Sequence, residues 1–360
     1  MIDPISFLIV ILLAVGLSHV VSPNDCRNRL FWIVVPGILL LFITHPLALA
    51  FAFASFAFSI GVFLVGRALD RPRLKTRIPY AILLLLFVPD VMRLASQAPI
   101  LWLGSAFFIV RQMMTVAQGI KHAVALNQFI PALLLSTFFF VALPSGPVFN
   151  GLRSWELLKQ NSAPAYGEGC YRLFEGLVYL FAVAGIIGVT IKVLEFAAVQ
   201  SLGTASFAGI MLRFVAEPIA AFGFLFATFY GYSRMAEGSA LLFGFEVPQN
   251  FNKPHRARDL GDFWKRWHRS MADFVMQYIY LPLLVTTSRA KLALIAAFVS
   301  MGLWHNFSLG FLVWGFGHGV GLAFLLPWAQ RRNIKPAVLR LASLTYVIML
   351  SGIAHGVWSK

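Results

Sequence analysis

The stretch LAFAFASFAFSIGVFLVGRALDRPRLKTR, residues 49–77, decides the fold class of this chain. Residues 49–66 contain no charged side chain, and residues 67–77 hold five basic ones. About 20 apolar residues in a helix cross the roughly 30 Å hydrocarbon layer of a bilayer, and short basic loops favour its cytoplasmic side. The stretch therefore predicts a transmembrane helix that ends at a loop inside the cell.

Apolar runs of this kind recur along the whole chain. Of its 360 residues, 59% are hydrophobic and 12% are charged, about half the charged fraction of an ordinary soluble domain. This composition predicts an all-α integral membrane protein with about eleven transmembrane helices and, at 239–245 and 271–285, interfacial or re-entrant helices. The predicted spans are 5–21, 31–47, 49–66, 79–94, 100–118, 129–144, 174–200, 206–230, 291–305, 309–328 and 341–358. We found no repeat or soluble linker, so residues 1–360 are predicted to form a single membrane domain.

The net charge of +15 would indicate nucleic acid as a partner of a soluble protein. Here the basic residues gather in loops at 67–77, 252–270 and 331–340, which predicts one cytoplasmic face in contact with anionic lipids and no nucleic-acid partner. Counting back three spans from the loop at 67–77 places residue 1 outside the cell, and the span that runs outward from Lys291 places His305 toward the outer surface. The two cysteines exclude a disulfide scaffold, and no pattern predicts a metal site.

Two histidines are candidates for proton transfer. His305 ends the run AAFVSMGLWHNFS, residues 296–308, where a neutral imidazole can accept a proton from a hydroxyl group. The alternative is an interfacial histidine packed within an aromatic belt. His268 lies among basic residues, which disfavour its protonation; the alternative is a loop histidine of a cytoplasmic basic patch. His318, in WGFGHGVGL, is better explained by close packing of a glycine-rich helix.

The segment DFWKRWH, residues 262–268, could bind phosphate groups, since Lys265 and Arg266 supply charge and hydrogen-bond donors. An amphipathic interfacial helix explains the same charges without a ligand. No phosphate loop, dinucleotide fingerprint or nucleophile elbow is present. A serine nucleophile is therefore disfavoured, although Ser145 before Gly146-Pro147 leaves one candidate.

Four segments together resemble the membrane-bound O-acyltransferase family, in particular its bacterial branch of alginate O-acetyltransferases and D-alanyl transfer proteins of teichoic acid synthesis. LLFGFEVPQNFNKPHRARDLGDFWKRWHRSMADFVMQYIYLPL, residues 241–283, is similar to the family pattern GF-x-x-P-x-NF-x-x-P-Y, FW-RRWH-x-S and DY-x-Y-x-PL. MGLWHNFSLGFLVWGFGHGVGLAF, residues 301–324, resembles its GLWHG and WG-x-x-HG segments. Weaker matches are LGSAFFIVRQM, 103–113, and FFFVALPSGPVFNGLR, 138–153. The family-like core thus covers about 100–325.

The resemblance implies a ring of tilted helices around a central funnel in a bacterial cytoplasmic (inner) membrane. It implies that His305 is the catalytic histidine and that His268 is a second catalytic-site histidine. An acyl thioester, acetyl-CoA or a phosphopantetheine carrier, would enter from the cytoplasm as a substrate, with no permanently bound cofactor. A glycan hydroxyl would enter from the outside. The predicted substrate-binding residues are Asn306, Trp304, Trp264, Lys265, Arg266, Trp267, Arg269 and Ser145.

The chain departs from the family pattern at three points. Asn306 replaces the usual glycine, Tyr232-Ser233-Arg234 replaces Tyr-Ser-Asp, and the chain lacks terminal helices of many relatives. The last point favours a separate partner, either a carrier protein or a periplasmic or extracellular partner acyltransferase. Besides acetyl transfer, the alternatives are D-alanyl transfer from a carrier protein, a non-catalytic scaffold, and a glycan transporter. A transporter lacks support because we found no inverted repeat and few acidic residues in spans, namely Asp90, Glu195 and Glu217.

Overall fold

The computed structural model describes residues 4–21, 25–88, 105–160, 163–201 and 211–356, and these form helices and connecting turns with no strand among them. The chain divides into two compact units. Unit 1 comprises Met1–Gly176 and Tyr232–Pro248, and unit 2 comprises Leu177–Gly231 and Gln249–Lys360. The prediction of one membrane domain is not tested by this division, because two long helices contribute residues to both units.

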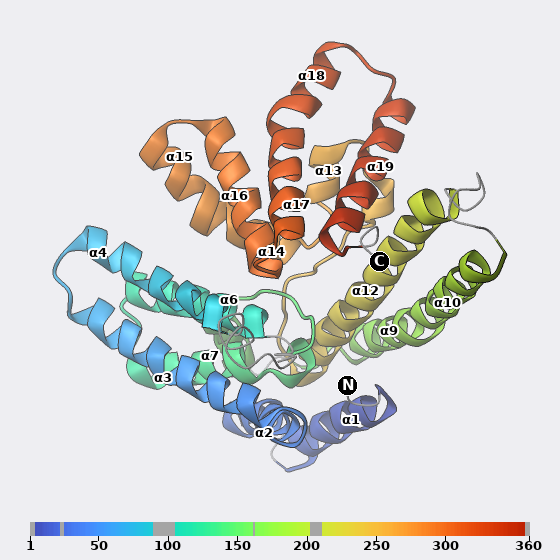
Figure 1. Ribbon diagram of the computed structural model, residues 1–360. Coiled ribbons are helices and arrows are strands. Elements are labelled where there is room, and N and C mark those ends of the chain that lie inside the picture. Colours follow the sequence, from blue (N-terminus) through green and yellow to red (C-terminus); the bar gives the residue numbers. More distant parts are fainter. Residues whose placement is uncertain (1–3, 22–24, 89–104, 161–162, 202–210, 357–360) are drawn as a thin grey trace. The chain divides into compact units, whose positions relative to one another are not determined.

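Unit 1 is built on the helices drawn in blue to teal in Figure 1. Inside it, the amide of Gln112 donates to the hydroxyl groups of Ser55 and Thr137, at 3.1 and 2.9 Å, and so joins three helices through buried polar groups. Such hydrogen bonds satisfy polar side chains away from water. Its helices are α1 (Pro4–Val21), α2 (Cys26–Thr44), α3 (Pro46–Ala68), α4 (Pro72–Arg77), η1 (Ile78–Phe87), α6 (Ser105–Lys121), α7 (Leu126–Phe138), η2 (Phe140–Ala142), α8 (Gly151–Lys159) and most of α9 (Tyr166–Leu177).

Unit 2 contains the C-terminal helices, drawn in orange to red in Figure 1, where α16, α17 and α19 lie side by side. The phenol of Tyr346 on α19 donates to the Gly317 carbonyl on α17 at 2.6 Å. Its elements are η3 (Val178–Val183), α10 (Ala184–Ser201), η4 (Leu212–Ala216), the first half of α12 (Glu217–Phe243), η5 (Pro254–Arg256), α13 (Leu260–Trp264), α14 (Arg269–Val275), η6 (Met276–Tyr280), α15 (Leu281–Thr287), α16 (Ala290–His305), α17 (Leu309–Val320), η7 (Gly321–Leu325), α18 (Leu326–Arg331) and α19 (Pro336–Ala354).

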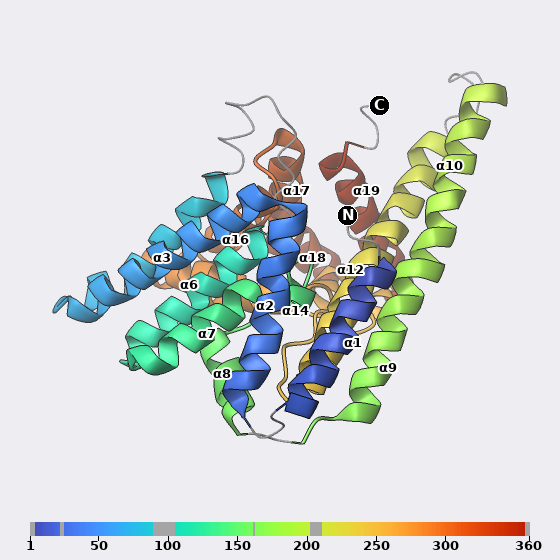
Figure 2. The same ribbon diagram turned by 90° about the horizontal axis from the view of Figure 1, so that it is seen from below.

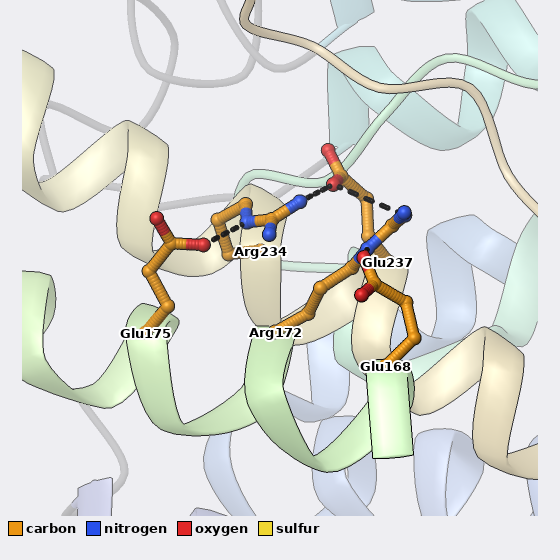
Figure 3. Close-up of polar contacts among 5 residues, drawn as sticks. All are labelled: Glu168, Arg172, Glu175, Arg234 and Glu237. Carbon is orange, nitrogen blue, oxygen red and sulfur yellow. Dashed lines mark hydrogen bonds and ion pairs between the residues drawn. The ribbon is translucent and has the colours of Figure 1, made fainter. Parts of the chain in front are cut away.

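Two long helices are joined by a cluster of charged residues. Figure 2 shows α9 and α10 continuing as one helix beside α12. Within unit 1, the Arg234 guanidinium donates to Glu175 at 2.6 Å and to Glu237 at 2.8 Å (Figure 3). Arg172 pairs with Glu168 at 2.6 Å and lies 3.7 Å from Glu237. The arginine that departs from the family pattern is therefore neutralised by carboxylates of both helices.

Helices α16 and α17 approach closely at glycines. A Cβ atom on Gly302 would lie 2.3 Å from the Phe311 carbonyl oxygen, and one on Gly315 would lie 2.4 Å from the Phe298 carbonyl oxygen. Both distances are shorter than any van der Waals contact allows. Small residues at helix interfaces permit this backbone approach in membrane proteins. The glycine-rich sequence of α17 thus fixes the position of α16, which carries His305.

Replacing Gly315 by alanine is expected to destabilise the protein by about 1–3 kcal/mol, the usual cost of overpacking. The new methyl group would meet backbone atoms of α16, which cannot move aside as a side chain can. Gly61 on α3 is the matched control, since a Cβ there meets nothing within 4 Å. Thermal unfolding of both purified variants in detergent measures the effect. Equal midpoints for Gly315→Ala and Gly61→Ala would contradict the packing argument.

The fold class is confirmed: the chain is an all-α, multi-pass membrane protein. Six described helices are long and apolar enough to cross a bilayer, and three more, 7–21, 126–138 and 290–305, are shorter apolar helices. The count of about eleven spans stays a prediction. The predicted ring of helices around a central funnel also stays a prediction, since each unit is described by itself. Parts of the predicted spans, 89–94, 100–104, 206–210 and 357–358, lie outside the described residues.

Three local predictions differ from the structure. Residues 239–243 are not a separate interfacial piece, because they end α12, whose polar second half is held by the charged cluster. The span predicted at 129–144 is too long, since α7 ends at Phe138 and Phe139 takes an extended conformation. Residues 78–87 form a 3-10 helix in place of an α-helix. In contrast, 271–285 lies in the short helices α14, η6 and α15, as expected for a region without a long span.

Candidate active site

The loop 249–252 is bound to the FWKRWHRS segment by hydrogen bonds. The backbone carbonyl of Asn250 accepts from the Arg269 N–H at 2.9 Å, and its side-chain oxygen accepts from the Ser270 hydroxyl at 2.5 Å. The Asn252 N–H donates to the Arg266 carbonyl at 2.9 Å. Asp259 caps α13 by accepting from the Asp262 N–H at 2.8 Å. The polar residues of this sequence stretch therefore hold one compact turn in place.

His268 lies at the end of this turn, where it begins α14. It has a left-handed backbone conformation, with φ of 44°, which costs a non-glycine residue of order 1–3 kcal/mol and is common at functional sites. Its side chain is 2% exposed and meets the ring of Phe229 edge-on at 4.7 Å. Burial lowers the pKa of His268 well below its usual value, and the neighbouring His305 acts in the same direction. His268 is therefore neutral at physiological pH.

His305 is the last residue of α16 and has an exposed side chain. The chain turns sharply after it, because the Asn306 N–H still donates to the Gly302 carbonyl while Asn306 itself is extended. Ser308 then caps α17. The exposed ring of His305 is therefore accessible to a substrate.

Trp304 lies between the two histidines. Its ring is 4.5 Å from that of His305 and 6.0 Å from that of His268, measured between ring centroids. The Asn306 side-chain oxygen is buried and makes no hydrogen bond within the described part of the chain. The structure thus brings together four of the predicted site residues around the end of α16.

The other predicted residues divide into buried and accessible ones. Trp264 and Trp267 are buried in aromatic clusters; Trp264 lies against Phe298, Trp314 and His318, and Trp267 is stacked on Phe222 and Phe263. Arg266 pairs with Asp262 at 3.0 Å and also donates to the Asn252 carbonyl. Lys265 is exposed and Arg269 is half-buried. Of the predicted phosphate contacts, Lys265 has the most accessible charge.

Ser145 belongs to unit 1, whereas all the residues above belong to unit 2. It is half-buried in the turn that follows η2. The next residue, Gly146, has no space for a side chain, since a Cβ there would lie 2.4 Å from atoms of Ala142. This close turn accounts for the glycine in the SGP segment. A role of Ser145 in binding remains a prediction.

His318 is fully buried in an aromatic box. Its ring contacts those of Trp264, Trp314 and Tyr346, with centroids 4.8–5.9 Å apart. Neither ring nitrogen has a hydrogen-bond partner in the described ranges. His318 therefore packs against Trp314, whose ring also contacts His305, in line with the packing role that its glycine-rich surroundings predict.

The segment 252–265 carries a basic surface. Burial and the positive charges of Arg256, Arg340 and Lys253 lower the pKa of His255. This residue is thus neutral near pH 7, and the charge of the surface comes from lysine and arginine. Its exposed basic residues are Lys253, Arg256, Arg258 and Lys265.

Two residues near these features carry no prediction from the sequence. His355, one residue beyond α19, lies with its ring 5.4 Å from Phe311, which in turn stacks on His305 at 5.6 Å. Arg111 on α6 in unit 1 is fully buried, lies 5.1 Å from the Phe149 ring centroid and has no hydrogen-bond partner for its guanidinium in the described ranges. A charged or histidine residue within or beside an apolar span is the sequence feature that could have identified both. Asp90 and the side chain of Glu195 lie outside the described part.

No group of three or more potential metal-ligating side chains occurs among the described residues. What the site offers is an exposed histidine, a second, buried histidine and a tryptophan between them. This arrangement suits proton transfer to or from a hydroxyl group.

Comparison with known proteins identifies related sequences. The family model of the membrane-bound O-acyltransferase family matches residues 102–356. The probable alginate O-acetylase of Azotobacter vinelandii is 29% identical over 220 residues, which are 59% of this chain and 41% of that protein. The teichoic acid D-alanyltransferase of Bacillus subtilis is 25% identical over 244 residues, 62% of this chain and 59% of that protein.

A third relative shares a shorter region at higher identity. The peptidoglycan O-acetyltransferase of Helicobacter pylori is 37% identical over 102 residues, 28% of this chain and 19% of that protein. The chain thus covers between about one fifth and three fifths of these three relatives. The matched family region includes the whole segment from His268 to His355.

Proposed function

Because this chain belongs to the membrane-bound O-acyltransferase family, we propose that it transfers an acyl group from a cytoplasmic thioester to a hydroxyl of an extracytoplasmic glycan. The observation that carries the proposal is the exposed imidazole of His305 at the end of α16, beside Trp304 and His268. Acetyl is the acyl group we propose, since two of the three relatives are named as acetyl-transferring enzymes. The bacterial names of the relatives support a place in the bacterial inner membrane.

In the proposed reaction His305 accepts the proton of the acceptor hydroxyl as its oxygen attacks the thioester carbonyl. The new C–O bond forms, the C–S bond breaks, and the leaving thiolate takes up the proton that His305 received. Asn306 or the Trp304 ring N–H would donate to the oxygen that becomes negative during attack. Binding both substrates next to one imidazole supplies much of the rate by positioning. No covalent acyl-enzyme is needed.

The donor would approach from the side of the basic segment 252–265. Lys265 and Arg269 are the cations best able to contact a phosphate of coenzyme A or of a phosphopantetheine arm. The same exposed basic residues offer a surface for an acidic carrier protein. This observation favours a second candidate function, transfer of D-alanine from a carrier, as in the name of the Bacillus relative.

The purified full chain in lipid nanodiscs, given radiolabelled acetyl-CoA and a bacterial cell-wall glycan, is expected to label the glycan in a base-labile ester. Parallel reactions with a D-alanyl-loaded carrier protein compare the two donors. Label from acetyl-CoA supports the proposal. Transfer from the carrier alone would replace acetyl by D-alanyl. Transfer from neither donor, with protein that is folded by thermal unfolding, would favour the scaffold or transporter alternatives.

A further inference from the structure

A groove of about 240 Å³ lies in unit 2 between α18 and α19, which form a helical hairpin (Figure 1). Its lining is almost entirely hydrocarbon. Its polar side-chain groups are the Ser343 and Tyr346 hydroxyls and the Trp328 ring N–H, and the Tyr346 hydroxyl already donates to the Gly317 carbonyl at 2.6 Å. Such a lining favours a hydrocarbon occupant, since a polar group would lose its hydration there without gaining a partner.

The groove extends along α19. On this side its lining begins at Ile334, in the turn before the helix, and ends at Tyr346. Val338 and Tyr346, the first and last lining residues on the helix, are eight positions apart, about 12 Å at 1.5 Å per residue. Helix α19 is long and apolar enough to cross a bilayer. An apolar groove along such a helix suits one acyl chain of a lipid, which runs in the same direction through the bilayer.

Basic residues flank the end of the groove at which Ile334 lies. Arg331, Arg332 and Lys335 belong to the same turn, and all three are exposed. The Arg332 guanidinium lies 5.9 Å from the ring centroid of Trp328, which is itself a lining residue. Residues 274–360 contain no aspartate or glutamate, so the helices from α15 to α19 supply no carboxylate to neutralise this turn. The apolar groove therefore has one strongly positive end.

A second basic segment is bound to the same helix. Arg340, which follows the lining residue Leu339, donates to the His255 carbonyl at 2.9 Å and so holds the segment 253–256 against α19. Lys253 and Arg256 are exposed on this segment. The loops 252–270 and 331–340, both predicted to face the cytoplasm, are therefore neighbours in unit 2. In that orientation the positive end of the groove lies at the level of the anionic lipid headgroups of the inner leaflet.

We propose that the groove between α18 and α19 binds one acyl chain of an anionic phospholipid, with the phosphate of its headgroup at the basic turn 331–335. The groove selects for a chain, and the turn selects for net negative charge. A zwitterionic lipid carries a cation beside its phosphate and so gains less from the turn. The site is independent of the proposed acyl transfer, because none of its residues belongs to the candidate active site.

The test is photocrosslinking of the full chain in phosphatidylcholine nanodiscs that hold a small fraction of a lipid with a diazirine in its acyl chain. This lipid is phosphatidylglycerol in one sample and phosphatidylcholine with the same chains in the other. After irradiation, peptide mass spectrometry measures the labelled fraction of residues 321–346. We expect phosphatidylglycerol to label this segment at least about fivefold more strongly, the ratio that corresponds to about 1 kcal/mol from one neighbouring cation.

A substitution in the wall tests the groove. Ala342→Trp places a large side chain in it from an exposed position and is expected to lower labelling by phosphatidylglycerol at least about fivefold. Leu341→Trp is the matched control, since Leu341 is 68% exposed and is not a lining residue. This variant should be labelled as the wild type is.

A double substitution in the turn tests the charge. Arg331→Gln combined with Arg332→Gln should reduce labelling by phosphatidylglycerol to about the level of phosphatidylcholine. Arg71→Gln combined with Arg73→Gln is the control, because these arginines are exposed on a basic loop of unit 1 that does not line the groove. It should leave the labelling of 321–346 unchanged.

Four results would overturn the proposal. Equal labelling by the two lipids would indicate ordinary boundary lipid, and unchanged labelling of Ala342→Trp with unaltered thermal unfolding would exclude the groove. Displacement of the labelled lipid by an equal concentration of glycerophosphoglycerol, which has no acyl chain, would make the turn a phosphate site. A dimer that Ala342→Trp dissociates and Leu341→Trp does not would assign the groove to a second copy of the chain.

Discussion

Replacing His305 by alanine is expected to lower the rate of acyl transfer by a factor of about 10²–10⁴, the usual contribution of a general base. The imidazole is the exposed group at the end of α16 that we propose as the proton acceptor. His355 is also exposed, and its ring contacts Phe311, which stacks on His305. Since the side chain acts only in the proposed proton transfer, the KM for the thioester should stay within about twofold of the wild type. Steady-state kinetics with a labelled thioester measures both quantities.

A glutamine variant separates proton transfer from shape. His305→Gln keeps a polar side chain of similar size, yet it cannot accept a proton near neutral pH, so it should be as inactive as the alanine variant. His122→Gln is the control. His122 is exposed next to the end of α6, and its side chain is hydrogen-bonded to Gln118. Substantial transfer by folded His305→Gln, above about a tenth of the wild-type rate, would exclude general-base catalysis by this residue.

The second histidine should behave differently. His268 is buried against Phe229 and separated from His305 by Trp304. Its position is set by the left-handed turn and by the hydrogen bonds of Asn250 to Arg269 and Ser270, so we expect its substitution to affect the shape of the site more than proton transfer. The two histidines were singled out from sequence, but their connection through one tryptophan ring required the structure.

The sequence predicted helix bounds best where the residues of a single helix explain the hydrophobic pattern. The bounds of α3 and α16 follow from uncharged runs that end at charged or turn residues, and the structure places both helices close to the predicted spans. The extension of α12 to Phe243 was missed, because a segment containing Arg234 and Glu237 reads as too polar for a span. Only the pairing with Glu175 on another helix makes those charges tolerable there.

A cavity of unit 2 that is lined by residues of α12 and of the end of α19, among them Glu217 and His355, could not be predicted for a related reason. Glu217 and His355 stand at the ends of two helices far apart in sequence, and each alone is an ordinary polar residue at a span end. The aromatic packing of Trp264 and Trp267 could not be predicted either, since a sequence rich in aromatic and basic residues is typical both of a ligand-binding surface and of a buried cluster. Tertiary neighbours decide between these interpretations, and a single sequence does not contain them.

Restoring the family's aspartate in place of Arg234 is expected to destabilise this chain by about 3–5 kcal/mol, the cost of breaking a buried ion pair. Arg234 is 12% exposed and lies between the carboxylates of Glu175 and Glu237, which are 21% and 1% exposed. Arg234→Asp would replace the central cation by a third carboxylate in poor contact with water. Thermal unfolding in detergent should show a midpoint lower by several degrees, because the cluster joins α9 to α12.

The charge argument predicts a specific rescue. Arg234→Asp combined with Glu237→Arg returns a cation to the cluster, next to the introduced carboxylate and the native carboxylates of α9. The double variant should recover part of the lost stability, whereas loss of helix packing alone would not be repaired by a second substitution. Arg258→Asp is the control: this arginine also pairs with a carboxylate, Asp262 at 3.2 Å, but is 81% exposed, and exposed pairs contribute about 0–1 kcal/mol. If Arg234→Asp unfolds at the same temperature as Arg258→Asp, the cluster does not hold these helices together. If it unfolds earlier and the charge swap restores it, the charge of Arg234 is balanced in this chain by Glu175 and Glu237.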